Sequence, residues 1–464
     1  MRELTKGSPA KVIMTFALPI IFGNLLQQLY NLADGKIVST YVGTQAFAAV
    51  GATAVIANLI IGFVNGVTQG FGIPISRCFG AGDYKNMRRY VAGSFIMTVA
   101  MTLILTVGAL LGIEGLLHIL DTPADIMEEA LQYIRIIIMG TAFISLYNYS
   151  ANILRAVGES RIPLLCLVVA VILNIFLDIL FVHTFSMGLR GAAHATNIAQ
   201  CIAGVLCMAY LLFRFRELVP KGQEWQVQRR KYQEMTVFGI SLGMMSCFVS
   251  IGTVIFQTAV NRLGTKIVTA HIAARRIEEL TNVPMLCTGM AMTTYASQNL
   301  GAGEYDRINK GIHQAFVIVL VQGVIFTTFC WIFGHPLIRW ITSSNDTYIL
   351  DTAYRYLTRN TSFYFVLGPL FVLRCSLQGL EHKVIPVASS ILELVLKIVS
   401  TIWIVPVLGY TGVIYTEPII WIFMTLMLIG GYVRALKQIN EAEHIKSARN
   451  AKAENEKINV DNRL

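Results

Sequence analysis

The stretch Ser76-Arg-Cys-Phe-Gly-Ala-Gly-Asp-Tyr84 returns 221 positions later as Ser297-Gln-Asn-Leu-Gly-Ala-Gly-Glu-Tyr305. At the same offset, and without a gap, further residues match: Gly43 and Gly264, Ala49 and Ala270, Ala52 and Ala273, and Leu59 and Leu280. A match of this length indicates that the chain contains two copies of one unit.

The composition predicts where these two copies reside. Of the 464 residues, 55% are hydrophobic and only 14% are charged. A soluble domain of this size does not bury so much apolar surface, so we expect an all-α integral membrane protein. A helix needs about 20 apolar residues to cross a bilayer. About twelve such segments are expected, with starts near residues 12, 46, 90, 126, 160, 188, 235, 266, 309, 350, 384 and 410.

Six segments fall in each copy, and this even number predicts a parallel repeat in which both copies enter the membrane from the same side. We expect two six-helix bundles, residues 1–214 and 235–436, joined by a cytoplasmic linker at 215–234 and followed by a charged cytoplasmic tail at 437–464. Duplicated membrane units are typical of secondary transporters, which alternate access to a central site.

The net charge of +10 is concentrated in alternate loops rather than in one basic patch. By the positive-inside rule, both termini and the linker are therefore cytoplasmic, in a multi-pass protein of the cell membrane. This pattern gives no reason to expect nucleic acid as a partner. No cleavable signal peptide is apparent, because the first apolar segment contains several polar residues and lacks a small-residue cleavage pattern.

The motifs that would indicate an enzyme or a bound cofactor are not present in the sequence. The eight cysteines are scattered without metal-ligand spacing, and we read them as free thiols. There is no HExxH, nucleophile elbow or phosphate-binding glycine loop. We therefore expect neither catalysis nor a resident metal or cofactor.

Polar residues inside the apolar segments are the main functional signal, because each is costly in a membrane unless it is paired, hydrated or used. The first segment carries them at spacings of three and four, on one helix face: Asn24, Gln27, Gln28, Asn31 and Asp34. The amides are explained by interhelical hydrogen bonds. Asp34 has no basic partner on its helix, so it either takes up a proton or binds a cation.

The fifth segment repeats this pattern, with Asn174 and Asp178 on one face at a spacing of four, and Thr196 follows in the next segment. Two carboxylates in one cleft would titrate as a coupled pair. Such a pair suits proton exchange, and a site made only of oxygen ligands also suits a hard cation such as sodium. The spacing does not choose between the two ions.

Several stretches together resemble the multidrug and toxic compound extrusion (MATE) transporters, over almost the whole chain: Leu29-Tyr-Asn-Leu-Ala-Asp34, Val42-Gly43, Ala48-Ala-Val-Gly51, Gly66, Gly70, Phe79-Gly-Ala-Gly-Asp83 and Leu154-Arg-Ala-Val-Gly158. The resemblance implies twelve helices in two bundles that form a V around a cleft, and export of organic compounds in exchange for protons or sodium. Asp34, Asn174, Asp178 and Thr196 are similar to the cation site of the DinF-like branch. Lys36 departs from the family pattern and would weaken proton coupling if it reached Asp34.

The second copy does not repeat the acidic site. At the offset of 221 Asp34 corresponds to Ile255, and at 223 Asn174 corresponds to Lys397 and Asp178 to Thr401. The second copy has intramembrane charges of its own: Arg275, Arg276, Glu278, Glu279, Glu393, Lys397 and Glu417. Arg275 with Glu279, and Glu393 with Lys397, have the spacing of neutralising pairs.

We expect the substrate cleft to be lined by Gln27, Asn31, Tyr133, Asn148, Arg275, Glu278 and Lys397. Aromatic faces beside a carboxylate suit amphipathic organic cations, exported by a monomeric transporter. A flippase for lipid-linked or other metabolites is the rival interpretation, and it would need a more cationic cavity.

Overall fold

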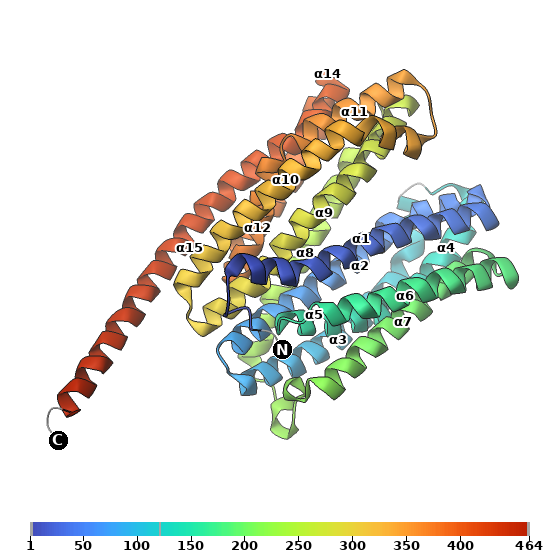
Figure 1. The fold of residues 1–464 in the computed structure, drawn as a ribbon. Coiled ribbons are helices and arrows are strands. Elements are labelled where there is room, and N and C mark those ends of the chain that lie inside the picture. The colour runs from blue at the N-terminus through green and yellow to red at the C-terminus, as the bar shows by residue number, and fades with distance from the viewer. Residues whose placement is uncertain (1–2, 120–121, 462–464) are drawn as a thin grey trace.

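The computed structural model describes residues 3–119 and 122–461, without the side chains at 32, 36, 44, 47, 442 and 444–461. Within these residues the chain is helical nearly throughout and contains no strand. Figure 1 shows two groups of helices, α1–α7 (blue to green) and α8–α15 (yellow to red). We call them the N-lobe and the C-lobe.

The helices begin within a few residues of the starts expected from the sequence, which confirms the all-α membrane fold. The N-lobe holds α1 (Pro9–Tyr41), α2 (Thr44–Gly80), α3 (Tyr84–Ile119), α4 (Ala124–Met139), α5 (Thr141–Ala156), α6 (Arg161–Asp178), the π-helical turn η1 (Ile179–Thr184) and α7 (Gly188–Arg214). Two short 3-10 turns, η2 (Arg216–Leu218) and η3 (Gly222–Trp225), lead to the C-lobe. It holds α8 (Arg229–Asn261), α9 (Thr265–Ala302), α10 (Tyr305–Thr342), α11 (Thr347–Thr361), α12 (Tyr364–Gly379), α13 (Val384–Val399), the π-helical turn η4 (Ser400–Ile404), α14 (Val405–Leu408) and α15 (Tyr410–Asp461).

Lipid offers no hydrogen-bond partners, so each segment must satisfy its backbone internally, and a helix does so. In the described residues, ten helical stretches are long and apolar enough to span a membrane. Two of the twelve expected segments, α9 and α11–α12, fall outside that set. α9 carries Arg275, Arg276, Glu278 and Glu279 in its middle, and it depends on protein neighbours rather than lipid.

The backbone repeats with the same offset as the sequence. At three equivalent chain reversals both copies place a glycine in the positive-φ region, where other residues are strained. The pairs are Gly43 (119°) with Gly264 (98°), Gly82 (68°) with Gly303 (69°), and Gly188 (60°) with Gly409 (57°). The π-helical turns η1 and η4 also begin 221 residues apart. The internal duplication is therefore present in the backbone structure as well as in the amino-acid sequence.

The lobes meet at the duplicated loops. A Cβ atom on Gly80 would lie 1.9 Å from the backbone oxygen of Gln298, and one on Gly301 would lie 1.9 Å from that of Arg77. The offset of 221 relates Gly80 to Gly301 and Arg77 to Gln298, so the two contacts are reciprocal. Each copy of the opening stretch thus packs against the other copy.

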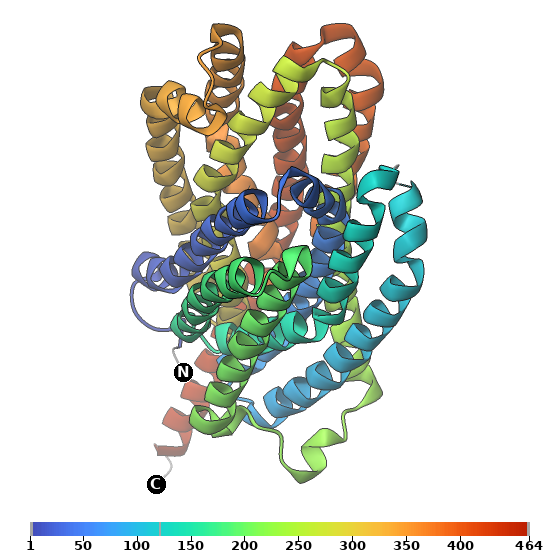
Figure 2. The same cartoon turned by 90° about the vertical axis from the view of Figure 1, so that its right-hand side faces the viewer.

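Two further glycines in the C-terminal half of α2 pack against the backbone of α8, whereas a glycine in the N-terminal half makes no such contact. A Cβ on Gly66 or Gly70 would lie 2.6 Å from a backbone oxygen of α8, whereas one on Gly51, nearer the start of α2, would meet nothing within 4 Å. The lobes are therefore in backbone contact at one end and diverge toward the other, as Figure 1 shows. In Figure 2 the linker between the lobes and both termini lie toward the contacting end.

The first helix of each lobe also crosses into the opposite lobe at this end. Ile13, Phe16 and Ile20 of α1 belong to the apolar core formed by α9, α10, α12 and α15. Met235 of α8 belongs to the core of the N-lobe. α8 begins at Arg229, inside the expected 215–234 linker, so the helix is longer at its N-terminus than the sequence predicted. At the other terminus, α15 continues through the expected 437–464 tail as far as Asp461.

Candidate functional site

Two acids lie where α1 packs against α6 in the N-lobe. Asp34 lies on α1, and Asp178 is the last residue of α6. Asp178 is fully buried. The Oδ1 atom of each carboxyl is buried and has no hydrogen-bond partner among the described residues. We call Asp34 and Asp178 the acid pair.

Neighbouring polar groups hold the acid pair in place. With its amide oriented to satisfy both partners, Asn174 donates to Asp178 Oδ2 at 2.9 Å and accepts from the backbone N–H of Thr196 at 3.1 Å. The Thr196 hydroxyl in turn shares a hydrogen bond of 3.1 Å with the Tyr30 hydroxyl. Immediately after Asp178 the helix widens into the π-helical turn η1, a distortion that occurs often at functional sites.

The structure joins Asn174, Asp178 and Thr196 by hydrogen bonds and places Asp34 on α1, the helix that carries Tyr30. Tyr133 lies on α4 and packs against an apolar core of the N-lobe. The pattern of polar residues missed Tyr30. Its spacing of four from Asp34 puts it on the same helix face, and that spacing could have identified it. The expectation about Lys36 concerns a side chain outside the described residues.

Three adjoining cavities extend from Asn174 and Thr196 toward the junction of the lobes. The first is lined by Gln27, Tyr30, Asn174, Thr196 and Gln200 among others. The second shares Gln27 with the first and adds Asn24, Asn65, Asn148 and Arg155. The third shares Ile20, Arg155 and Met290 with the second. Two of the expected cleft residues, Gln27 and Asn148, therefore line these cavities, and Asn31 lies exposed on α1 one turn beyond Gln27.

The three expected cleft residues of the C-lobe, Arg275, Glu278 and Lys397, are paired with one another or with their neighbours. Glu278 is fully buried, 3.0 Å from Arg275 Nη1, and accepts a hydrogen bond of 3.1 Å from the Tyr356 hydroxyl. The predicted pair of Arg275 with Glu279 is also present, with 3.8 Å between Arg275 Nη2 and Glu279 Oε1. Glu278 is thus a second and closer partner that the spacing of four did not predict.

Lys397 joins two helices in the same region. Its Nζ lies 3.1 Å from Glu393 on α13, which confirms that predicted pair, and 3.3 Å from Glu417 on α15. Glu417 occupies the repeat position of Thr196, and Lys397 that of Asn174. In the C-lobe these buried acids and bases form ion pairs. In the N-lobe, by contrast, Asp34 and Asp178 have no base within 4 Å among the described side chains.

Comparison with known proteins agrees with this architecture. The MatE family model matches the chain twice, over residues 19–180 and 242–403. The protein named "Probable multidrug resistance protein YpnP" of Bacillus subtilis is 26% identical over 406 residues, which cover 87% of this chain and 88% of that protein.

Two solved structures share the fold. The crystal structure of MATE in complex with MaL6 superposes with a TM-score of 0.84 at 24% identity, over 95% of this chain and 99% of the other. An outward-facing multidrug resistance MATE transporter of the MOP superfamily gives a TM-score of 0.82 at 24% identity, over 95% and 98% of the two chains. Because the family model covers well over half of the residues, this chain belongs to the MatE family of multidrug and toxic compound extrusion transporters.

Proposed function

We propose that the protein is an antiporter that exports amphipathic organic compounds in exchange for protons, and that the acid pair is the coupling site. Two acids on packed helices carry this proposal: Asp178 is fully buried, and the Oδ1 atom of each carboxyl is buried without a partner. Two neighbouring carboxylates repel each other when both are ionised, so such a pair favours keeping one proton. Taking up or releasing that proton changes the charge where α1 meets α6, and so biases the equilibrium between two arrangements of the helices.

The hydrogen bonds around the acid pair favour a proton over sodium. Hard cations such as calcium and magnesium are held by about six oxygen ligands. Here the Asn174 oxygen already accepts from a backbone N–H, and the Thr196 hydroxyl is bonded to Tyr30. The two Oδ1 atoms of the acid pair are the buried oxygens left uncommitted, which suits a shared proton.

The orientation of the lobes supports alternating access across a cell membrane. The helix ends and loops at the end where the lobes meet carry Arg77, Arg88, Arg89, Arg161, Arg307 and Lys383. By the positive-inside rule this closed end faces the cytoplasm, with both termini, and the diverging end faces outward. We take residues 1–214 and 235–436 as the two units that move, and one chain holds both, so we propose a monomer. The multidrug names of the relatives support a broad range of organic substrates.

Transport in proteoliposomes tests this function. The full-length protein is reconstituted, and uptake of rhodamine 6G, an amphipathic cationic dye, is followed under a pH gradient or a sodium gradient applied separately. We expect the pH gradient alone to drive uptake, and Asp34→Asn to abolish that response. Asp125→Asn removes an exposed carboxylate at the start of α4 and serves as the matched control. Uptake driven by sodium, or full proton-driven uptake in Asp34→Asn, would overturn the proposal.

A further inference from the structure

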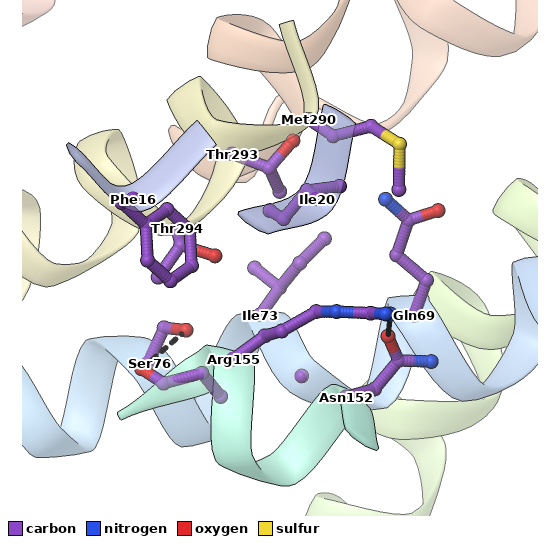
Figure 3. A pocket seen from close by; sticks show the side chains of 12 residues that line it. Phe16, Ile20, Gln69, Ile73, Ser76, Asn152, Arg155, Met290, Thr293 and Thr294 are labelled. Atoms are coloured by element: carbon purple, nitrogen blue, oxygen red, sulfur yellow. Dashed lines mark hydrogen bonds between the residues drawn. The ribbon is translucent and has the colours of Figure 1, made fainter. Parts of the chain in front are cut away.

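Arg155 places a positive charge between the two lobes. It lies near the C-terminal end of α5 (Thr141–Ala156) and lines both of the cavities that adjoin the junction of the lobes. In Figure 3 its guanidinium extends between Gln69 and Asn152, with Met290 and Thr293 of the C-lobe on the facing side. A ligand at this arginine would therefore contact both lobes.

No carboxylate neutralises this arginine. Its Nη1 donates to Asn152 Oδ1 at 3.2 Å, its Nε is buried without a partner, and no described carboxylate lies within 4 Å of it. By contrast, Arg275, Arg374 and Lys397 of the C-lobe each have a carboxylate within 4 Å. Removing a charge from water is costly unless it is paired, so the free guanidinium indicates that its partner is supplied from outside the chain.

The surroundings of Arg155 define the rest of such a ligand. The amide of Gln69 and the hydroxyl of Thr294 add polar groups along the same cavity. Asn152 is already bonded to Thr68 and Arg155, and the Thr293 hydroxyl donates to the backbone oxygen of Cys375. Phe16, Ile20, Ile73 and Met290 provide an apolar wall. The Ser76 hydroxyl is already committed to the backbone oxygen of Ala156. The cavity thus matches a molecule with one anionic group and an apolar body.

The second copy of the repeat does not carry this charge. At the offset of 223, which relates the MatE matches to each other, Arg155 corresponds to the neutral Gln378. The N-lobe therefore carries two acids at one position and an unpaired base at another. Gln27 of α1 lines both the cavity beside Asn174 and the cavity beside Arg155.

We propose that Arg155 is a substrate-binding residue, and that the exported compounds carry a carboxylate or a phosphate which binds its guanidinium while the apolar body rests on Phe16, Ile20 and Met290. This inference rests on the proposed export function and narrows its substrates from purely cationic amphiphiles to zwitterions and anions. Arginine suits both oxyanions, because its planar fork donates two parallel hydrogen bonds to either.

Binding of matched dyes to the full-length protein in nanodiscs tests this assignment. Rhodamine B and its ethyl ester differ only in a free carboxylate, and riboflavin 5′-phosphate and riboflavin differ only in a phosphate. A charge-assisted hydrogen bond in a partly buried site makes a difference of about tenfold to a hundredfold in affinity. We expect the wild type to bind the anionic member of at least one pair at least tenfold more tightly, and the pair that discriminates identifies the oxyanion.

The variants separate a binding role from a structural one. Arg155→Gln should bring the dye with the free carboxylate or phosphate down to the affinity of its counterpart that lacks this group, and Arg155→Lys should restore part of the preference. Arg216→Gln removes an exposed arginine of the linker and should change neither dye. Equal affinities of wild type for both members of both pairs would overturn the inference, even if Arg155→Gln failed to fold. These measurements need no ion gradient, so a preference for the anionic dye without proton-driven transport would contradict only the proposed antiport.

Discussion

Gly80 of α2 lies directly against the backbone carbonyl of Gln298 in α9, and its repeat counterpart Gly301 lies against that of Arg77. Only glycine permits two helices to approach so closely, because any Cβ would overlap the carbonyl oxygen. Polar side chains secure this contact on both sides. Arg77 is paired with Glu234 and Glu381, while the Gln298 amide donates to the backbone of Ala156. The repeated stretch therefore forms the closed end of the molecule.

Replacing either glycine should weaken this closure. We expect Gly80→Ala or Gly301→Ala to destabilise the closed arrangement by about 1–3 kcal/mol, the usual cost of overpacking. Cys78, which is buried beside the contact, reports the change in a variant without the other cysteines, through its labelling by an impermeant maleimide. Labelling should rise at least fivefold. Gly112→Ala on α3, where a Cβ meets nothing within 4 Å, should leave labelling unchanged, and an equal rise there would contradict the explanation.

The acid pair should behave as one unit. We expect Asp34→Asn and Asp178→Asn each to abolish proton-driven uptake, and the double variant to lose no more than either single variant, because residues that share one function are not additive. Initial rates in proteoliposomes measure this, with dye binding in nanodiscs as a check that each variant is folded. Proton-driven uptake that persists in either single variant and is lost only in the double variant would mean that the two carboxyls bind protons independently.

The buried charges of the C-lobe should be essential to stability. Lys397→Met leaves Glu417 buried without its cation and Glu393 with only Arg374, 3.6 Å away, and we expect it to destabilise the protein by about 3–5 kcal/mol. Replacing Glu417 by glutamine in the same chain should restore part of the loss. Lys310→Met breaks an ion pair with Asp306 in which both side chains are more than half exposed, and should cost less than about 1 kcal/mol. Thermal unfolding in detergent ranks these variants, and equal effects of the two lysine substitutions would contradict the argument.

The linker should detach from α3 in acid. Glu224 in η3 accepts from Arg88 Nε at 2.7 Å and 2.8 Å, and this ionic hydrogen bond lowers the pKa of Glu224 below its ordinary value of 4.5. A lowered folded-state pKa means that the stabilisation is complete above pH 4.5 and is lost as the pH falls through the lowered value.

Trp225 is next in the chain and packs edge-on against Phe95 of α3, so it reports the attachment. Its ¹⁹F resonance in protein labelled with 5-fluorotryptophan should titrate below pH 4.5. In Glu224→Gln the resonance should already be shifted and should no longer titrate, whereas Glu128→Gln, an exposed carboxylate of α4, should behave as the wild type. Titration that persists in Glu224→Gln would assign the transition to another group.

Much of the fold could be predicted because lipid leaves the backbone few choices. Apolar segments of this length span a membrane as helices, and the repeat already matched Gly43 with Gly264 and Gly82 with Gly303 in the sequence. The sequence also allowed Asp34 and Asp178 to be predicted as parts of one site, since each acid lies in an apolar helix with no basic partner beside it. Within single helices the spacing of four correctly paired Glu393 with Lys397 and Arg275 with Glu279. It missed the closer, fully buried partner Glu278, because burial is set by the neighbouring helices and not by spacing.

By itself, the sequence determined the membrane class, the number of segments, the twofold repeat and the identity of the acids, because these follow from composition and from the period of the chain. Only the tertiary structure decided that the two copies of the repeated stretch touch each other, that α1 crosses into the C-lobe core, and that Arg155 has no carboxylate beside it. These features depend on contacts between residues more than a hundred positions apart. Side chains from different helices compete for such contacts, and local pattern does not contain the outcome of that competition.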